Sequence, residues 1–393
     1  MTTNCTRFGL LILIASSNGL LLAGPMQYTI RDLGSSSAAP ISGGLNDLGQ
    51  VAFSVAPPYV LGMSDRREQL LFFDGTSVHQ IPSLGGEFAS FLDINNLGTM
   101  VGAASSPEYY TYFHGIGLQP YRPIRYEGNR VELIETPETT WAIADSINDS
   151  NQIVGTIGTR TGQHSFFWDP VTGFQDLGTF GGEVAYPVDI NNNADVLIDS
   201  HDEGPIYYYG DYAYKGMQTL VYNEGKVMRL PDPGSHIISG AAINNRGQIA
   251  GAYATIPGKE GRAFIWDSEN GMTDIGESNL LSGASDINDN GVAVGSYSDS
   301  YPNFTSDAFI YDPEFGRRRL IDLLKNNPGW IALERASDIN NRGQIFGTGR
   351  HYGSYEWHAF LVTPVPEPSA AIPIAVAYLS TILGRSCRRR LVH

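Results

Sequence analysis

One pattern of apolar and polar positions recurs along the chain and predicts a repeated pair of β-strands. Each copy has an apolar residue, usually Ile, then Asn, a short polar turn and an apolar strand. Asn and Gly tolerate the positive φ angles of tight turns, so each copy predicts a hairpin. The anchor asparagines of the pattern are Asn46, Asn95, Asn148, Asn191, Asn244, Asn288 and Asn340.

The spacing of the anchor asparagines predicts a repeat architecture. Consecutive anchors are 49, 53, 43, 53, 44 and 52 residues apart. A period near fifty residues is typical of propeller blades or of a solenoid. An aromatic strand follows each hairpin, as at 166–169 and 264–267, and a fourth strand follows the next turn, as at 174–178. Four antiparallel strands per unit are typical of a propeller blade.

The two ends of the repeat region complement each other. Residues 28–34 read as a fourth strand with no preceding three, and residues 359–363 read as a third strand with no fourth. Joined, they predict a composite blade that leaves no open sheet edge. The predicted fold is therefore all-β, a seven-bladed β-propeller of four-stranded antiparallel blades over residues 26–364.

The repeat resembles the HAF-type repeats of bacterial extracellular proteins. The third unit carries the resemblance best, with an aromatic strand at 166–170, Asp-Leu-Gly-Thr-Phe-Gly-Gly at 176–182 and Asp-Ile-Asn-Asn at 189–192. The resemblance covers most of residues 26–364. It implies the propeller fold and an exported setting, and it implies no catalytic residue.

The composition agrees with a β-rich body and excludes one class of partner. The chain of 393 residues has 25 Lys and Arg against 41 Asp and Glu, and this net charge of −16 excludes a basic nucleic-acid binder. The 45 Gly, 22 Pro, 21 Tyr and 17 Phe favour short aromatic strands and many turns. Cys5 and Cys387 both lie near the chain ends, so no disulfide or Cys-based metal site is expected between them.

The first 24 residues read as a secretory signal peptide. Arg7 precedes an apolar run at 8–15, and a second short run at 20–23 ends in Gly24. The apolar run is too short to span a bilayer. Export by this segment is the prediction, and a buried N-terminal strand is the alternative.

The last 29 residues, 365–393, contain three parts in a fixed order. An extended Pro-Glu-Pro segment precedes an uncharged stretch at 370–383, and an arginine cluster follows, which places the body outside by the positive-inside rule. This order resembles the PEP-CTERM sorting signal of exported bacterial proteins. The resemblance implies an exosortase-type processing enzyme as partner and transient membrane association of the tail; an ordinary C-terminal helix is the alternative. The sorting motif is Val365, Pro366, Glu367 and Pro368, and the membrane stop is Arg385, Arg388, Arg389 and Arg390.

Three long insertions, at 103–123, 199–217 and 296–307, are expected as irregular loops on one face of the propeller. Tyr residues cluster in these insertions, and Tyr suits recognition of sugars or proteins. The candidate hydrogen-bonding groups beside the Tyr cluster of the second insertion are Asp199, Asp202, Glu203 and Asp211. The alternative is a set of tyrosines that pack on each other over the rim or the channel. The candidate ligand-binding residues are Tyr109, Tyr110, Tyr112, Tyr207, Tyr208, Tyr209, Tyr212 and Tyr214.

No metal and no cofactor is predicted. Residues 286–291 fit the first half of a calcium loop, but Tyr297 stands where a bidentate Glu is needed, which favours a hairpin turn. Seven histidines show no ligand spacing and are expected in turns or at the rim. They are His79, His114, His164, His201, His236, His351 and His358.

The sequence contains no motif of a hydrolase, P-loop or dinucleotide site. It therefore predicts an exported, non-catalytic binding or structural protein of the cell surface or extracellular matrix, with exopolysaccharide or surface proteins as partners. The alternative is a polysaccharide-active glycosidase or lyase with its site on the long-loop face. A cluster of carboxyls at the channel, two of them about 5 to 9.5 Å apart, would favour that alternative.

Overall fold

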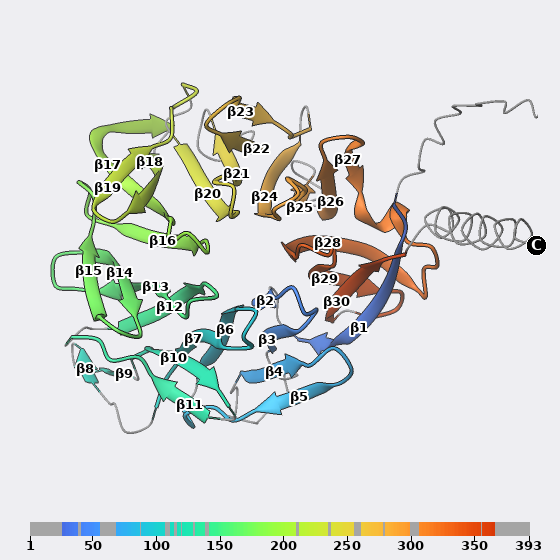
Figure 1. Ribbon diagram of the computed structural model, residues 1–393, viewed down its shortest axis with the longest axis horizontal. Coiled ribbons are helices and arrows are strands. Elements are labelled where there is room, and N and C mark those ends of the chain that lie inside the picture. Colours follow the sequence, from blue (N-terminus) through green and yellow to red (C-terminus); the bar gives the residue numbers. More distant parts are fainter. Residues whose placement is uncertain are drawn as a thin grey trace, which may run out of the picture. The chain divides into compact units, whose positions relative to one another are not determined.

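The computed structural model confirms the predicted propeller. Five four-stranded sheets and one sheet of eight strands, which is two blades joined by a single bridge, form a ring of seven blades (Figure 1). The sequence-predicted signal peptide and most of the sorting tail lie outside the described residues. The structure describes residues 26–37, 41–55, 68–86, 88–106, 111–113, 116–118, 120–128, 130–137, 141–209, 212–234, 237–254, 261–277, 280–298, 306–354 and 356–365, with the backbone alone at 111–118 and 202–215.

The first four blades follow the predicted order along the chain. Blade 1 contains β2 (Gly43–Leu45), β3 (Val51–Val55), β4 (Gln69–Phe73) and β5 (Val78–Ile81). Blade 2 contains β6 (Ala89–Ile94), β7 (Met100–Ala104), β10 (Arg122–Glu127) and β11 (Arg130–Leu133). Blade 3 contains β12 (Trp141–Ile147), β13 (Ile153–Gly158), β14 (Gln163–Asp169) and β15 (Gly173–Gly178). Blade 4 contains β16 (Ala185–Ile190), β17 (Val196–Tyr209), β18 (Tyr212–Asn223) and β19 (Lys226–Arg229).

The remaining three blades close the ring. Blade 5 contains β20 (Ile237–Ile243), β21 (Ile249–Ala254), β22 (Arg262–Asp267) and β23 (Gly271–Asp274). Blade 6 contains β24 (Leu281–Ile287), β25 (Ala293–Ser298), β26 (Ser306–Asp312) and β27 (Gly316–Arg319), and a 3-10 helix η1 (Leu320–Leu323) follows it. Blade 7 contains β28 (Trp330–Ile339), β29 (Ile345–His351), β30 (Trp357–Pro364) and β1 (Tyr28–Ser36).

Blade 7 is the predicted composite of the two ends of the propeller. β1 pairs antiparallel with β30 from Tyr28 opposite Pro364 to Ser36 opposite Trp357. The backbone N–H of Val365 also donates to the carbonyl oxygen of Gln27 at 2.8 Å. The last strand of the ring is therefore supplied by the start of the body.

The glycine that ends the repeated apolar pattern has a packing role in the second strand of the blades. Gly155 lies opposite Phe166, and a Cβ at Gly155 would approach the ring within 2.4 Å. At Gly347, opposite Phe360, the same approach would be 2.5 Å. Any larger residue would push the buried ring out of the blade, so glycine is required there.

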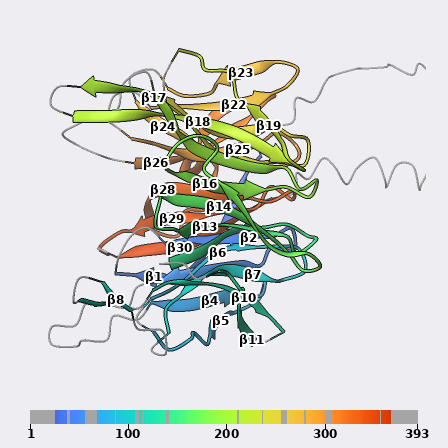
Figure 2. The ribbon, with the colours of Figure 1, turned by 90° about the vertical axis from the view of Figure 1, so that its left-hand side faces the viewer.

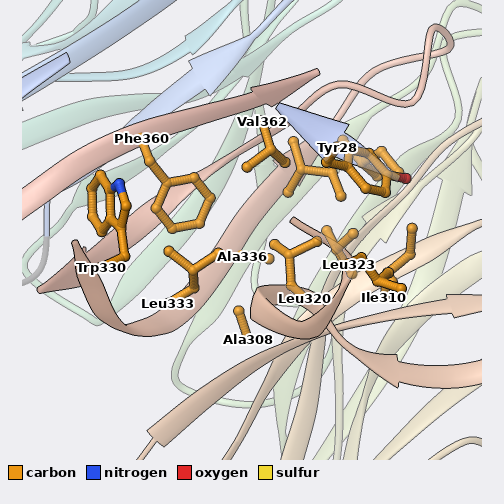
Figure 3. Packing of buried hydrophobic residues seen from close by; sticks show 13 residues of the cluster. Tyr28, Ala308, Ile310, Leu320, Leu323, Trp330, Leu333, Ala336, Phe360 and Val362 are labelled. Carbon is orange, nitrogen blue, oxygen red and sulfur yellow. The ribbon is translucent and has the colours of Figure 1, made fainter. Parts of the chain in front are cut away.

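The core lies between neighbouring blades. Figure 3 shows the cluster at blades 6 and 7, where the ring of Trp330 lies beside Phe360 and Leu333. The centroids of the Trp330 and Phe360 rings are 5.8 Å apart, with the rings at 84° to one another. Burial of each large apolar side chain of this kind stabilises the fold by about 1.5–3 kcal/mol.

The insertions that follow the second strand form hairpins where the structure describes them, which corrects the expected irregular loops. In blade 2, β8 (Thr111–Phe113) pairs with β9 (Ile116–Leu118). In blade 4, the pairing of β17 and β18 resumes after His201 and continues to Tyr209 opposite Tyr212. Runs of Tyr favour extended strands, which accounts for the difference. Figure 2 shows β8 and the far end of β17 on the same side of the ring.

We call this side the connection face, because it carries the links from second to third strands. The opposite side, the turn face, carries the turns from first to second strands. No helix among the described residues is long and apolar enough to cross a membrane.

Candidate functional site

The anchor asparagines form a closed ring of hydrogen bonds at the turn face. In each anchor, Oδ1 accepts the backbone N–H groups two and four residues further on, as Asn46 does at 3.0 Å each from Leu48 and Gln50. Its Nδ2 donates to the backbone oxygen of the anchor in the next blade, from Asn46 to Asn95 at 3.0 Å and finally from Asn340 back to Asn46 at 2.9 Å. All seven anchors are buried.

The residues after the anchors form a second ring. They are Asp47, Asn96, Asp149, Asn192, Asn245, Asp289 and Asn341, and the backbone N–H of each donates to Oδ1 of the next. Every Asp lies between two Asn residues; the carboxylate of Asp149 accepts the amides of Asn96 at 3.0 Å and Asn192 at 2.9 Å. Amide donors therefore surround the carboxylates of this ring.

Four further carboxyls lie two positions before the anchors and face the channel from blades 2, 4, 6 and 7. Each accepts the backbone N–H that precedes the anchor of the following blade. The distances from these N–H groups are 2.9 Å to Asp93, 2.8 Å to Asp189, 2.7 Å to Asp286 and 2.6 Å to Asp338. These carboxyls therefore tie each of their blades to the next.

Burial raises the pKa values of these four channel carboxyls above their usual range. Burial, and the nearby charges of Asp93 and Asp286, raise the pKa of Asp189 to about 7. Burial also raises the pKa of Asp338 well above its usual range, and a hydrogen bond with Asp286 adds to this effect. The hydroxyl of Ser146 lies 2.8 Å from Asp93 and 2.9 Å from Asp189; it has one proton to donate, so the second bond needs a protonated carboxyl.

A fifth carboxyl of the channel belongs to blade 3. Asp145 lies at the β-bulge of β12, and its Oδ2 accepts the hydroxyl of Thr156 at 2.8 Å. Burial raises the pKa of Asp145 to about 7, against the effect of the Thr156 hydrogen bonds. Carboxyls with such pKa values are able to act as general acids, which makes the channel a candidate site.

The space at the channel mouth is small. All seven blades line a cavity of about 290 Å³ there, at the lower limit of pockets that hold small molecules. A larger groove of about 720 Å³ lies between blades 1 and 2, where Phe72, His79 and Tyr126 contribute to its wall. Neither cavity could be predicted from the sequence, because the walls of each come from more than one repeat.

The predicted ligand-binding tyrosines lie in the two hairpins as far as the structure describes them. Tyr207 is opposite Tyr214, Tyr209 is opposite Tyr212, and Tyr208 is opposite Ala213. Tyr112 is opposite Gly117 in the hairpin of blade 2. Tyr109 and Tyr110 lie outside the described residues, as do Pro366, Glu367, Pro368, Arg385, Arg388, Arg389 and Arg390. Val365 continues β30 through its bond to Gln27.

Asp199 does not serve the Tyr hairpin as the sequence suggested. Its side chain is buried and accepts the hydroxyls of Thr219 at 2.6 Å and Ser239 at 2.7 Å. It therefore joins blade 4 to blade 5. The segment 286–291 forms the β24–β25 turn, and the carboxylate of Asp289 accepts the amide of Asn245 at 2.9 Å.

The described histidines lie in strands, so none of them occupies a turn, which was one of the two positions expected from the sequence. His79, His164, His201, His351 and His358 belong to β5, β14, β17, β29 and β30. Several pair with a carboxylate on a neighbouring strand, as His164 does with Asp176 at 3.0 Å. Such cross-strand pairs stabilise sheets, and the sequence pattern does not reveal them because it does not fix which residues of two paired strands lie opposite each other.

The fold and these rings define a closed β-propeller, and solved structures agree with that class. The β-propeller domain of the Trilobed protease from Pyrococcus furiosus is 9% identical, with 87% of this chain and 96% of that chain covered and a TM-score of 0.53. Acylaminoacyl peptidase from Pyrococcus horikoshii is 10% identical, with 86% and 54% covered and a TM-score of 0.53. TolB from Acinetobacter baumannii is 12% identical, with 69% and 63% covered and a TM-score of 0.47.

These similarities concern the fold alone, because the identities are low. The chain spans 63% of the length of TolB and 54% of that of the peptidase. The Pyrococcus furiosus propeller is described as having an open velcro topology, whereas β1 completes the last blade here. No family model and no curated protein matches the sequence.

Proposed function

We propose that this protein is an exported, non-catalytic binding or structural component of the bacterial cell surface or extracellular matrix. The observation that carries the proposal is the extended β17–β18 hairpin, which brings two pairs of Tyr residues opposite one another at the connection face. Residues opposite each other in an antiparallel pair share a face of the hairpin. Tyr at such positions is suited to sugars and protein surfaces.

The charge of the body favours neutral ligands. Without the two predicted end segments, 20 Lys and Arg remain against 40 Asp and Glu. A body with this excess of acidic groups repels anionic polymers at low ionic strength. We therefore expect a neutral exopolysaccharide, or a surface protein with a basic patch, as the ligand of the hairpins.

The channel groups support a structural role for the opposite face. Asp93, Asp189, Asp286 and Asp338 each accept a backbone N–H of the next blade, so their oxygens are already used in joining the ring. The cavity beside them holds about 290 Å³. Such a space is small for the several sugar rings that a polysaccharide-active site binds.

The proposed route to the surface rests on the two chain ends. Residues 1–24 would direct export, and the tail at 365–393 would be sorted by an exosortase-type enzyme that reads Pro366, Glu367 and Pro368. The resemblance of the repeats to HAF-type proteins supports the same address. Extracellular localisation of the body follows from both.

Replacement of the hairpin tests the proposed binding site. His201 and Met217 are paired, so a two-residue Asn-Gly turn in place of 202–216 joins them as a minimal blade hairpin. We expect the full chain to bind at least one neutral extracellular polysaccharide saturably, and the variant to bind it about 10-fold or more weakly, as for loss of a main contact. Glycan arrays followed by titration calorimetry measure this.

The matched control is Tyr352→Ala, which removes a Tyr that is 87% exposed in the β29–β30 connection on the same face. This control should keep full affinity. Polysaccharide affinity that survives the hairpin replacement contradicts the proposed site and directs attention to the groove between blades 1 and 2.

A polysaccharide-active enzyme is the second candidate, because the channel holds the hydrogen-bonded carboxyl pair Asp286 and Asp338. A glycosidase holds its acid and its second carboxyl about 5 to 9.5 Å apart, which is wider than a hydrogen bond, so Asp338 as the acid would need its partner carboxylate elsewhere in the channel. Release of new reducing ends is followed in the same binding assays. Steady release that Asp338→Asn abolishes would replace the non-catalytic proposal by this one.

A further inference from the structure

Three side chains of the metal-ligating type converge in blade 7, away from the channel and from the hairpins. Asp32 belongs to β1, His351 to β29 and His358 to β30. Asp32 and His358 are 326 residues apart in the sequence. In the part of the chain that the structure describes, no other group of three or more His, Cys, Asp or Glu side chains is arranged so as to hold an ion.

The three ligand atoms are spaced for one ion. Oδ2 of Asp32 is 2.9 Å from Nδ1 of His358 and 3.2 Å from Nε2 of His351. All three atoms lie within 4.8 Å of one another. Around a tetrahedral Zn²⁺ with bonds of about 2.0–2.1 Å, neighbouring ligand atoms are about 3.3 Å apart. The distance from His351 to Asp32 matches this spacing, and the hydrogen-bonded distance from His358 to Asp32 would lengthen by a few tenths of an ångström around the ion.

One of these three ligand atoms makes no hydrogen bond. Nε2 of His351 is buried and makes no hydrogen bond, although it lies 3.2 Å from the carboxylate of Asp32. A buried polar nitrogen without a hydrogen bond is costly. An ion bonded to this nitrogen would satisfy it.

The surroundings hold the three side chains in place. Oδ1 of Asp32 accepts the backbone N–H of Gly34 at 2.8 Å, across the β-bulge of β1. The buried Trp330 ring is 4.1 Å from the His351 ring and 6.0 Å from the His358 ring, centroid to centroid. Fixed outer contacts of this kind orient metal ligands before the ion binds.

We propose that Asp32, His351 and His358 bind one divalent transition-metal ion, which fastens the first strand of the propeller to its last two strands. Two imidazole nitrogens and one carboxylate oxygen form a donor set that suits Zn²⁺. The side chains of Asp32, His351 and His358 are 38%, 23% and 17% exposed. The ion can therefore enter from solvent and complete its coordination with water.

Metal binding would stabilise the closure of the ring. β1 is the outermost strand of blade 7; among the described strands it pairs with β30, and Tyr28 at its start also forms a bridge with Leu324. An ion that binds the folded state and not the unfolded chain raises the free energy of unfolding. The proposed site thus adds a link between the first and the last strands of the propeller, which are otherwise joined by backbone hydrogen bonds.

Titration of the chelator-treated full chain with Zn²⁺ tests this site. We expect one zinc ion per chain by mass spectrometry of the metal, and a higher melting temperature with zinc than without it. Replacement of Zn²⁺ by Co²⁺ should give the visible absorption of nitrogen and oxygen ligands. The variants His351→Gln and His358→Gln should each bind zinc at least about 10-fold more weakly.

The matched control is His164→Gln, which removes a His that pairs with a single carboxylate, Asp176, in blade 3. It should bind zinc as the parent chain does, and circular dichroism of the metal-free variants should show the same β-rich spectrum. Absence of stoichiometric zinc in the parent chain overturns the proposal. So does zinc binding that persists in the double variant of His351 and His358 or is lost equally in the control. Polysaccharide binding at the hairpins is a separate measurement, so either proposal can fail alone.

Discussion

Five carboxyls of the channel combine burial with hydrogen bonds from neighbouring strands and blades. Burial raises the pKa of each above its usual range, to about 7 for Asp145 and Asp189. Between about pH 4 and pH 7 the folded protein therefore holds protons that the unfolded chain has released. The contribution of Asp145 and Asp189 to the free energy of unfolding is complete below about pH 4 and is lost as the pH rises from there through about 7.

Substitution of one channel carboxyl tests this pH dependence. Asp145→Asn keeps an acceptor for Thr156 and removes the charge that forms at high pH. We expect the stability of the variant relative to the parent to increase by the order of 1–2 kcal/mol or more from pH 5 to pH 8. Urea denaturation at both pH values measures the difference.

The matched variant Asp74→Asn should behave in the opposite way. Backbone hydrogen bonds to Ser77 and Thr76 and a bond to His79 lower the pKa of the exposed Asp74 to about 2. Its carboxylate therefore stabilises the fold above pH 4, and the variant should be less stable at pH 8. If the stability of the parent protein rises from pH 5 to pH 8 as much as that of Asp145→Asn, the raised pKa of Asp145 is contradicted.

At single positions the sequence predicts backbone conformation better than side-chain partners. The turn glycines Gly247 and Gly343 adopt the expected positive φ of 74°. Ala194 takes the same place in blade 4 with a φ of 61°, at a conformational cost that glycine avoids. The contact of His358 with Asp32 was not predictable, because the predicted pairing of the two end strands does not include their register or the β-bulge between Asp32 and Gly34.

Among the elements, the turn between the first and second strands does two things at once. In blade 5, Oδ1 of Asn244 accepts two backbone N–H groups of its own turn, and Nδ2 donates to Asn288 in blade 6 at 2.9 Å. The sequence predicts the first of these roles, since Asn is typical of turns. It does not predict the second, since a local motif does not contain the position of the next blade.

Asn244→Asp separates the two roles. A carboxylate keeps the acceptor bonds of the turn but loses both donor bonds, to Asn288 and to Gln248, and brings a charge into a buried position. We expect a loss of about 2–4 kcal/mol in the free energy of unfolding, measured by urea denaturation at pH 7. Asn326→Asp, the same change at an exposed position in the loop after η1, should cost less than about 0.5 kcal/mol. Equal losses in both variants would mean that the inter-blade bond contributes nothing.

At the scale of the whole molecule, the spacing of the anchors and the incomplete end strands predict the number of blades and the composite blade. The structure confirms both. Each blade buries its apolar faces against its neighbours, so the number of repeats determines the number of blades in the ring. The prediction that the long insertions form irregular loops was wrong, because strand-forming Tyr segments extend β17 and β18 beyond the blade.

Circular permutation tests the closure by β1. Residues 27 and 365 are hydrogen-bonded neighbours, so a short Gly-Ser linker can join them. A cut within the β13–β14 turn at 160–161 makes blade 3 composite, and this permutant should melt close to the parent. A cut between blades 3 and 4, at 180–183, leaves every blade continuous and should lower the melting temperature by the order of 5 °C. Equal melting of the two permutants would show that strand exchange does not stabilise the ring.

The pairing of β1 with β30 also sets an order of events in time. Thr29 and Thr363 are in register although 334 residues separate them. A chain that is made, or threaded through a pore, amino terminus first carries β1 unpaired until its last strand has followed. Blade 7 therefore forms last, and the ring locks only after the whole body has emerged. For a chain that must cross a membrane unfolded, this delay prevents the ring from closing before the whole body has passed through.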